Sequence, residues 1–324
     1  MKKVGMLFFL TFLLLLFFTG NVLAAESSDS LAKEEIKMNE SISYDGESEE
    51  KNQNVAPIIQ RDSENNVSLP SEGTGNTSHT LIEDDLSDVT EGTYDNYSII
   101  GPDQRTRITN TTAFPNRAVV SLVIQFPNEP NNLIGCSGFL VNEDTVITAG
   151  HCVYDHGKGG WAEEVTSLPG RNENAAPYGS YGFETLYTVT GWRADQNSEY
   201  DYGAIKLAGA PGNDTGWFGY STTNAESNPS GLTFNVSGYP CDKPNGTMWT
   251  DSGTILSVTD RQLGYDADTY GCQSGSPVHR NYSDTGHTAI AIHAYGVGGT
   301  NPPLNRGTRI TQDVFDNIQY WSNE

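Results

Sequence analysis

Short apolar runs alternate with turn-forming residues over the last two-thirds of the chain. Residues 118–126 form one run, and residues 138–141 and 145–148 flank an Asn-Glu-Asp turn. These runs have the length and β-branched content of strands, and Gly, Pro and Asn separate them. Many short strands at this spacing predict an all-β body, either a sandwich or a barrel. Further runs lie at 202–207, 232–236, 253–258 and 288–293.

Helical periodicity is sustained only near the carboxyl end of the sequence. Val314, Phe315, Ile318 and Trp321 recur near i, i+3 and i+4, and Thr311 ahead of them is a suitable N-cap. This pattern predicts one C-terminal α-helix.

The first residues have the character of an export signal. Residues 1–24 hold two lysines and no acid, and an apolar run over 6–18 is followed by small residues before Ala25. This arrangement predicts a signal peptide over 1–24 and a secreted, extracellular protein that keeps no membrane attachment after cleavage. The alternative is a membrane anchor, but the run is short for a hydrocarbon core about 30 Å thick.

A strongly acidic segment follows. Residues 25–97 contain 18 acids and 4 bases and few large apolar side chains. Such a segment buries too little apolar surface to offset its ordering entropy, so we expect it to be disordered. Its position favours a propeptide that an activating protease removes, over a permanent linker or solubilising tail.

Residues 98–324 form the expected globular body, with 23 acids and 12 bases. The whole chain has a formal charge of −23 and a pI near 4.4. A nucleic-acid-binding protein needs a basic surface to neutralise phosphates, so this composition argues against nucleic acid as a partner. We expect the body to act as a monomer.

All four cysteines lie in the body, as expected for an exported protein. Four cysteines allow three pairings. Cys136 and Cys152 bracket two strands that a hairpin brings together, which favours a Cys136–Cys152 disulfide and leaves Cys241 to pair with Cys272. The rival interpretation is a zinc site, but the spacings are not those of zinc ligands.

Three short sequences contain residues suited to nucleophilic catalysis. They are Thr-Ala-Gly-His-Cys at 148–152, Tyr-Asp-Tyr-Gly at 200–203 and Gly-Cys-Gln-Ser-Gly-Ser-Pro at 271–277. Each alone has a structural explanation, such as a turn cap or a common glycine loop. Together they supply a nucleophile, a base and an acid in the order His, Asp, Ser, which is the order found in chymotrypsin-like barrels.

The chemistry of these residues fits acyl transfer. Ser274 is a weak nucleophile that needs a base, and the imidazole of His151 takes and returns a proton near neutral pH. A buried carboxylate at Asp201 fixes the His tautomer and stabilises the imidazolium. Gly275 permits a sharp turn behind the nucleophile, and the N–H groups of Cys272 and Ser274 are candidates for an oxyanion hole.

The motifs at 148–152 and 274–277 resemble those of bacterial trypsin-like serine proteases. Ser-Gly-Ser-Pro is similar to the glutamyl endopeptidase branch, and 268–283 and 307–322 resemble Bacillus extracellular proteases historically called metalloproteases. The resemblance covers 98–324. It implies two antiparallel six-stranded β-barrels with the site between them, the triad His151, Asp201 and Ser274, and a mature N-terminus near Ser98.

The resemblance also implies a substrate preference. In this branch, selectivity for Glu before the scissile bond is attributed to a His on the strand after the nucleophile and a Ser or Thr five residues before it. Those positions are His293 and Thr269. Gln273 cannot pair with a new amine, so the Ser98 amine is expected to add positive charge near His293. A structural role for His293, and a broader specificity signalled by Ala294, are the alternatives.

Two other functional classes were considered. A zinc protease is disfavoured because the chain has no His-Glu-x-x-His, and a non-catalytic binding module is disfavoured because the triad is intact. We therefore expect protein or peptide substrates and no cofactor for catalysis. A structural calcium ion held by loop carboxylates such as Asp155 or Asp195 stays open as an alternative, although the sequence shows no complete ligand set for it. Tyr97 precedes Ser98, so an enzyme selective for Glu would not make this cut itself.

Overall fold

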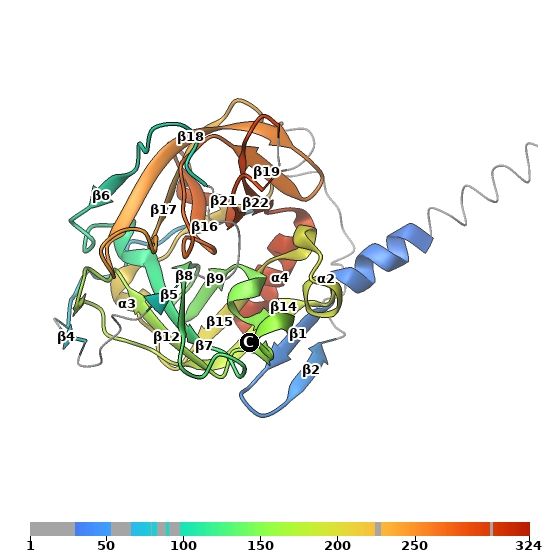
Figure 1. Cartoon of the computed structure of the whole chain (residues 1–324), viewed down its shortest axis with the longest axis horizontal. Coiled ribbons are helices and arrows are strands. Elements are labelled where there is room, and N and C mark those ends of the chain that lie inside the picture. The colour runs from blue at the N-terminus through green and yellow to red at the C-terminus, as the bar shows by residue number, and fades with distance from the viewer. Residues whose placement is uncertain are drawn as a thin grey trace, which may run out of the picture.

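Two antiparallel six-stranded β-barrels lie side by side in the body, as the resemblance implied (Figure 1). The computed structural model describes residues 30–52, 66–78, 80–82, 89–90, 98–223, 228–298 and 301–324. The expected signal peptide over 1–24 lies outside these residues. None of the described helices is long and apolar enough to cross a membrane.

The first barrel is built from six strands in the order β12-β7-β8-β9-β15-β14. An isolated bridge between Ser167 and Tyr181 brings β12 back towards β14. The β-branched and aromatic side chains of β7 to β9 are buried, which is why the apolar runs identified these strands. The strands are β7 (Val119–Gln125), β8 (Leu133–Leu140), β9 (Thr145–Thr148), β12 (Glu164–Pro169), β14 (Phe183–Val189) and β15 (Gly203–Leu207).

The second barrel has the order β20-β17-β18-β19-β22-β21, and pairing between β20 and β21 closes it. Its strands are β17 (Thr233–Gly238), β18 (Met248–Val258), β19 (Gln262–Tyr265), β20 (Pro277–Tyr282), β21 (Gly286–Tyr295) and β22 (Asn305–Arg309). Smaller strands extend both sheets or form ribbons: β6 (Thr106–Ile108), β10 (Tyr154–Asp155), β11 (Gly160–Trp161), β13 (Ala175–Ala176) and β16 (Gly219–Ser221).

The predicted C-terminal helix is α4 (Gln312–Asn323). Thr311 is its N-cap, and the Thr311 side chain accepts a hydrogen bond from the Val314 N–H at 3.4 Å. The apolar stripe that predicted the helix is buried, with Ile318 and Trp321 fully inaccessible. Two short helices, α2 (Thr190–Asp195) and α3 (Gly212–Thr215), lie in connections.

The expectation of disorder over 25–97 is wrong for the described part of that segment. Residues 30–38 are helical. Strand β1 (Ser41–Tyr44) pairs with β14 and with β2 (Glu49–Asn52). Strand β3 (Val67–Ser68) pairs with β16, β4 (Thr80–Leu81) with β13, and β5 (Val89–Thr90) with β8. The described parts of residues 25–97, called the prosegment after the role expected for them, therefore add strands to the sheets of both barrels.

Contacts with the body order the prosegment, although its composition is too polar to build a core of its own. Ile42 is fully buried in the main apolar core, and Ser41 accepts a hydrogen bond from the Trp321 indole at 2.7 Å. Arg261 pairs with Glu35 at 2.8 Å. An acidic, polar segment becomes ordered because strand edges satisfy its backbone and a few apolar side chains enter an existing core.

Candidate active site

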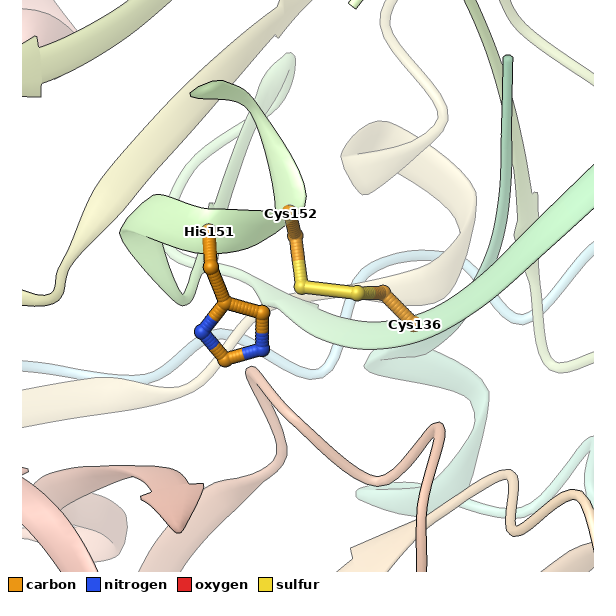
Figure 2. Close-up of side chains that lie close together, drawn as sticks. All are labelled: Cys136, His151 and Cys152. Atoms are coloured by element: carbon orange, nitrogen blue, oxygen red, sulfur yellow. A yellow bond between two sulfur atoms is a disulfide. The ribbon is translucent and has the colours of Figure 1, made fainter. Parts of the chain in front are cut away.

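His151 lies in a single turn of 3-10 helix, Gly150–Cys152, directly after β9. A disulfide joins Cys152 to Cys136 on β8, so the neighbouring strand anchors this turn (Figure 2). Gly150 has to be small, because a Cβ there would lie 2.8 Å from the Trp192 ring. The disulfide and the packed turn fix the backbone from which the imidazole projects.

Asp201 holds His151 with two hydrogen bonds, one to its imidazole and one to its backbone. It follows the 3-10 turn Ser198–Tyr200 and is fully buried just before β15. Its Oδ2 lies 2.7 Å from His151 Nδ1, and its Oδ1 accepts the His151 backbone N–H at 2.8 Å. Because the carboxylate accepts at Nδ1, the bond favours a tautomer with the proton on Nδ1 and leaves Nε2 as the acceptor.

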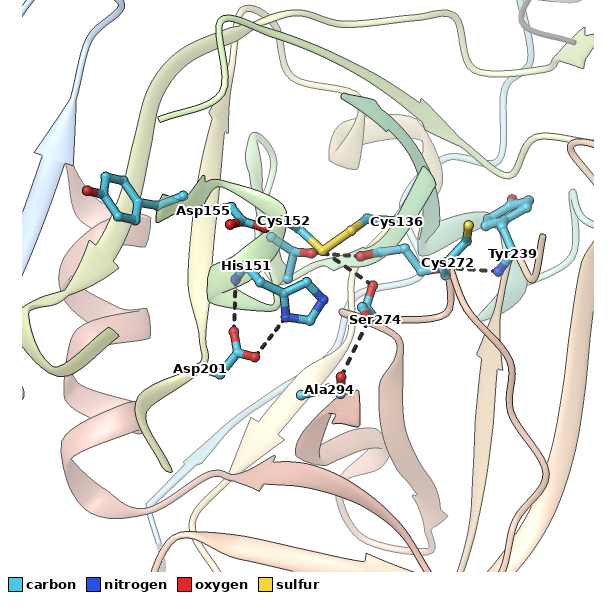
Figure 3. The surroundings of a disulfide bond; sticks show 12 residues. Cys136, His151, Cys152, Asp155, Asp201, Tyr239, Cys272, Ser274 and Ala294 are labelled. Atoms are coloured by element: carbon cyan, nitrogen blue, oxygen red, sulfur yellow. Dashed lines mark hydrogen bonds and ion pairs between the residues drawn. A yellow bond between two sulfur atoms is a disulfide. The ribbon is translucent and has the colours of Figure 1, made fainter. Parts of the chain in front are cut away.

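Ser274 lies beside the His151 imidazole, on the side away from Asp201 (Figure 3). Its Oγ donates to the Ala294 carbonyl at 3.5 Å. Gly275 has a φ of 88°, and a Cβ there would lie 2.0 Å from the Ser137 carbonyl oxygen. The turn behind the nucleophile therefore requires glycine, as the sequence suggested. The structure thus brings together the three residues expected to form a triad.

The backbone at Cys272 adopts an unusual conformation with a φ of 73°. A residue with a side chain seldom adopts this left-handed conformation, so the surroundings must hold it. Cys272 is disulfide-bonded to Cys241, the other pair expected from the sequence. Ser137 donates its hydroxyl to the Cys272 carbonyl at 3.0 Å and accepts the Tyr239 N–H at 2.9 Å. These contacts fix the peptide next to Ser274.

Ser98 and Thr269 are in contact at the second barrel. The Ser98 carbonyl accepts the Thr269 N–H at 3.2 Å and the side-chain amide of Asn305 at 2.6 Å. Ser98 is 3% exposed and Thr269 is fully buried. The Thr269 hydroxyl has no hydrogen-bond partner among the described residues. A buried hydroxyl without a partner is costly unless a ligand satisfies it.

His293 lies on β21 and is 3% exposed. Its Nδ1 lies 2.7 Å from the hydroxyl of Tyr265 at the end of β19. Burial lowers the pKa of His293 to about 3, and the nearby His151 contributes to this in the same direction. Burial also raises the pKa of Tyr265 well above its usual value. The phenol therefore keeps its proton and is able to donate to Nδ1, and in that tautomer the proton of neutral His293 is on Nε2.

Two other polar groups near the nucleophile have structural partners. Asp268 is 1% exposed, and its carboxylate accepts the backbone N–H groups of Ile100 at 2.7 Å and Gln104 at 2.9 Å. It thus anchors the chain just after Ser98. Gln273 accepts the Tyr270 N–H through its side-chain oxygen at 3.0 Å.

The calcium expectation involved Asp155 and Asp195. Asp155 accepts the Gly157 N–H at 2.8 Å and pairs with Lys158, so both carboxylate oxygens are engaged. Asp195 is exposed at the end of α2. Within the described ranges, the His/Cys/carboxylate group compact enough for a metal is Cys136, His151 and Cys152, but its two sulfurs form a disulfide.

Sequence reasoning missed Ser137, Tyr265 and Asn305, which orient the residues it did identify. Ser137 follows Cys136 directly, so its position beside a predicted disulfide was a usable signal. Tyr265 and Asn305 lie on β19 and β22, which the apolar runs did not identify. Their roles depend on strand pairing across the barrel, which no local pattern reports.

Comparisons with known proteins agree with this geometry. The family model described as Trypsin matches residues 108–321. The chain is 55% identical over 262 residues to the "Extracellular metalloprotease" of Bacillus subtilis, covering 80% of each chain. It is 42% identical over 271 residues to the "Glutamyl endopeptidase" of Bacillus licheniformis, covering 82% of each. A solved structure of a Glu endopeptidase in complex with MPD matches with TM-score 0.60 and 26% identity, over 70% of this chain and 100% of that one.

Proposed function

Since the chain belongs to the trypsin family of serine proteases, we propose that it is a secreted endopeptidase, made as a zymogen, which cleaves after Glu. The family relationship and its glutamyl endopeptidase relatives support the reaction class, which needs no cofactor for catalysis. The Bacillus subtilis relative is named "Extracellular metalloprotease", and the word extracellular in that name supports secretion. Protein and peptide chains are the substrates of this reaction.

In the proposed mechanism, Ser274 attacks the carbonyl carbon while His151 Nε2 takes its proton. Asp201 stabilises the resulting imidazolium through the 2.7 Å bond at Nδ1. The N–H groups of Cys272 and Ser274 stabilise the oxyanion. His151 then gives its proton to the leaving amine, and an acyl-enzyme remains. Water, deprotonated by the same imidazole, releases the acid and restores Ser274.

The proposed Glu preference rests on two buried groups, the Thr269 hydroxyl beside Ser98 and the His293 ring. The Thr269 hydroxyl has no partner in the part of the chain that the structure describes, and neutral His293 keeps a proton on Nε2 once Tyr265 donates to Nδ1. Both are donors suited to a carboxylate that has lost its hydration. Because the pKa of His293 is lowered to about 3, positive charge has to come from elsewhere. Cleavage before Ser98 creates an amine that supplies it.

The proposed zymogen follows from the same residues. Before cleavage, Ser98 is an ordinary peptide residue without a charged amine. Cutting at the Tyr97–Ser98 bond creates this amine next to Thr269. Tyr97 is a poor residue for a Glu-selective enzyme, so we assign this cut to another protease, or to trimming after a first cut at Glu91. Residues 91–97 lie outside the described residues.

Mature enzyme tests the specificity with two peptides that differ only in Glu or Gln before the scissile bond. Hydrogen bonds to a charged group are worth about 1.5–3 kcal/mol, so we expect kcat/KM to favour Glu by about 10- to 150-fold. His293→Gln should reduce this ratio. His279→Gln is the matched control, because His279 is equally buried on the neighbouring strand β20. Equal rates for both peptides would disprove the Glu preference and leave the protease assignment intact.

The role of the amine has its own test. Enzyme that keeps one or two extra residues before Ser98 moves the charge away from Thr269. We expect the ratio for Glu over Gln to fall in this form, with Gln hydrolysis little changed. An unchanged ratio would show that the Ser98 amine plays no part in recognition.

A further inference from the structure

A cavity of about 210 Å³ lies beside the candidate active site, next to both disulfides. Gly135, Cys136 and Cys272 line it and also line the small cavity that contains His151 and Ser274. The two spaces therefore share a wall. Tyr239 and Cys272 lie on the side of Ser274 away from Asp201 (Figure 3).

The position of this cavity relates it to the part of the substrate after the scissile bond. Thr269 and His293, which the proposed function assigns to the side chain before that bond, do not line it. A peptide whose carbonyl carbon lies at Ser274 extends in two directions from the oxyanion hole. The proposed function assigns one direction to Thr269 and His293. Since Cys136 and Cys272 line both spaces, we assign the other direction to this cavity.

Arg171 is the unusual residue of the cavity wall. It is 2% exposed. Its Nε donates to the Glu173 carbonyl at 2.9 Å, and its Nη1 donates to the Ser121 hydroxyl at 3.5 Å. Within the described part of the chain, no carboxylate pairs with Arg171, and burial lowers its pKa. A buried guanidinium without a counter-ion is costly, and an anionic ligand would offset that cost.

The surrounding loop holds Arg171 closely. A Cβ at Gly246 would lie 2.5 Å from the Arg171 Nε, so only glycine permits this approach. Lys243 also lines the cavity, but it pairs with Asp103 at 2.7 Å. The charge of Lys243 is therefore compensated, whereas no carboxylate among the described residues compensates that of Arg171.

The structure also shows that this wall binds extended peptide. Strand β5 of the prosegment pairs in parallel with β8, matching Val89 to Leu133 and Thr90 to Ile134. The Thr90 hydroxyl donates to the Leu133 carbonyl at 3.3 Å, and Val89 lines the cavity. The prosegment sequence here is Asp-Val-Thr-Glu at 88–91, so acids flank the paired residues.

We propose that this cavity is a subsite for an acidic side chain, Asp or Glu, within the first three substrate residues after the scissile bond. Arg171 binds its carboxylate, and the edge of β8 binds the backbone beside it. The inference rests on the proposed function and extends it to the leaving side. In the precursor, β5 occupies this edge, so the prosegment must leave before such a substrate binds.

Acyl transfer tests the leaving side independently of the residue that acylates the enzyme. Mature enzyme is first acylated with an ester substrate. Tripeptide amides that carry Asp or Asn at the first, second or third position then compete with water for the acyl-enzyme. The measured quantity is the ratio of the peptide product to the hydrolysis product. The amine attacks the acyl-enzyme ester, a peptide bond forms, and Ser274 regains its proton. We expect Asp to be favoured over Asn by about tenfold at one position, as for a charge-assisted hydrogen bond.

Variants assign the effect to Arg171. Arg171→Gln should abolish the Asp-to-Asn ratio, whereas Arg107→Gln should keep it, because Arg107 lies outside the cavity and pairs with Glu173 at 2.6 Å. Arg171→Lys retains charge without the planar fork and should keep part of the ratio. Arg171→Lys is the variant to measure if Arg171→Gln does not fold.

If Asp and Asn amides compete equally well with water at all three positions, the proposed subsite is wrong. A wild-type ratio in the folded Arg171 variants would overturn its assignment to this residue. Failure of the proposed Glu preference would appear instead in which ester acylates the enzyme, so the two failures are distinguishable.

Discussion

The prosegment strand β1 offers a direct test of whether residues 25–97 belong to the fold of the precursor. Ile42 is fully buried in the main core, although its segment is acidic and polar. Ile36, in the preceding helical stretch, is 54% exposed. Replacing each by Ala removes the same atoms from the same segment. The two substitutions therefore differ in burial, and they form a matched pair.

Deleting the buried side chain should be costly. Ile→Ala in a packed core destabilises by about 2–5 kcal/mol, because transfer free energy is lost and a cavity remains. We expect about 3 kcal/mol for Ile42→Ala, since its strand is held between β14 and β2. A surface substitution lies within about 0.5 kcal/mol, which is the expectation for Ile36→Ala.

Urea unfolding of the precursor, followed by tryptophan fluorescence, measures both values. A Ser274→Ala background prevents self-cleavage during the experiment. For Ile42→Ala, the urea concentration at half-unfolding should fall. The dependence of the unfolding free energy on urea should stay unchanged, because the fold is retained and only its stability changes. If Ile42→Ala and Ile36→Ala shift the midpoint equally little, β1 does not contribute to the stability of the precursor, and the disordered-tail interpretation returns.

Three further results are expected. His279 is buried with its pKa lowered to about 3, against about 6.5 when unfolded, so it contributes stability above pH 6.5 that is lost as the pH falls towards 3. His279→Phe should therefore flatten the loss measured by unfolding across that range, where its neighbour His287 also titrates with a lowered pKa. Gly275→Ala should lower kcat/KM at least about 100-fold. The added Cβ would strain the φ of 88° and clash with the Ser137 carbonyl, and the nucleophile would be displaced. Wild-type activity would show that the turn tolerates a side chain. Purified precursor should not cut itself at Ser98, and mass spectrometry finding that terminus without another protease would contradict the assigned maturation.

The fold was predictable where one face of a strand is continuously apolar. The runs at 118–126 and 145–148 correspond to β7 and β9, and the stripe from Val314 to Trp321 corresponds to α4. Strand β22 reads Asn-Arg-Gly-Thr-Arg, and four of its five residues are buried. No periodicity predicts such a strand, because its polar side chains are satisfied by partners distant in sequence, as when Arg309 donates to the Thr259 carbonyl at 3.0 Å.

The prosegment could not be predicted for a related reason. Composition reports whether a segment can build its own core, and residues 25–97 cannot. It does not report whether another part of the chain offers an edge and a groove. Ile42 and Val89 are two apolar residues among many acids, yet one enters the core and the other lines the cavity beside Ser274.

The candidate site was largely predictable from chemistry, because His151, Asp201 and Ser274 each lie in a local motif. The charge state of His293 was not predictable. The sequence suggested local positive charge near His293, whereas burial and the Tyr265 hydroxyl favour a neutral ring. Burial inside the barrel determines the pKa of His293. That burial depends on strands distant in sequence, which the local sequence around His293 does not reveal.

Ser274, activated by His151, is proposed to cleave the peptide bond after Glu without a metal. The most direct measurement is kcat/KM of the mature enzyme for a peptide cleaved after Glu, with and without a zinc chelator, beside Ser274→Ala. We expect hydrolysis that the chelator leaves unchanged and that Ser274→Ala lowers by several orders of magnitude. Activity that survives Ser274→Ala, or that the chelator abolishes, would contradict the proposal.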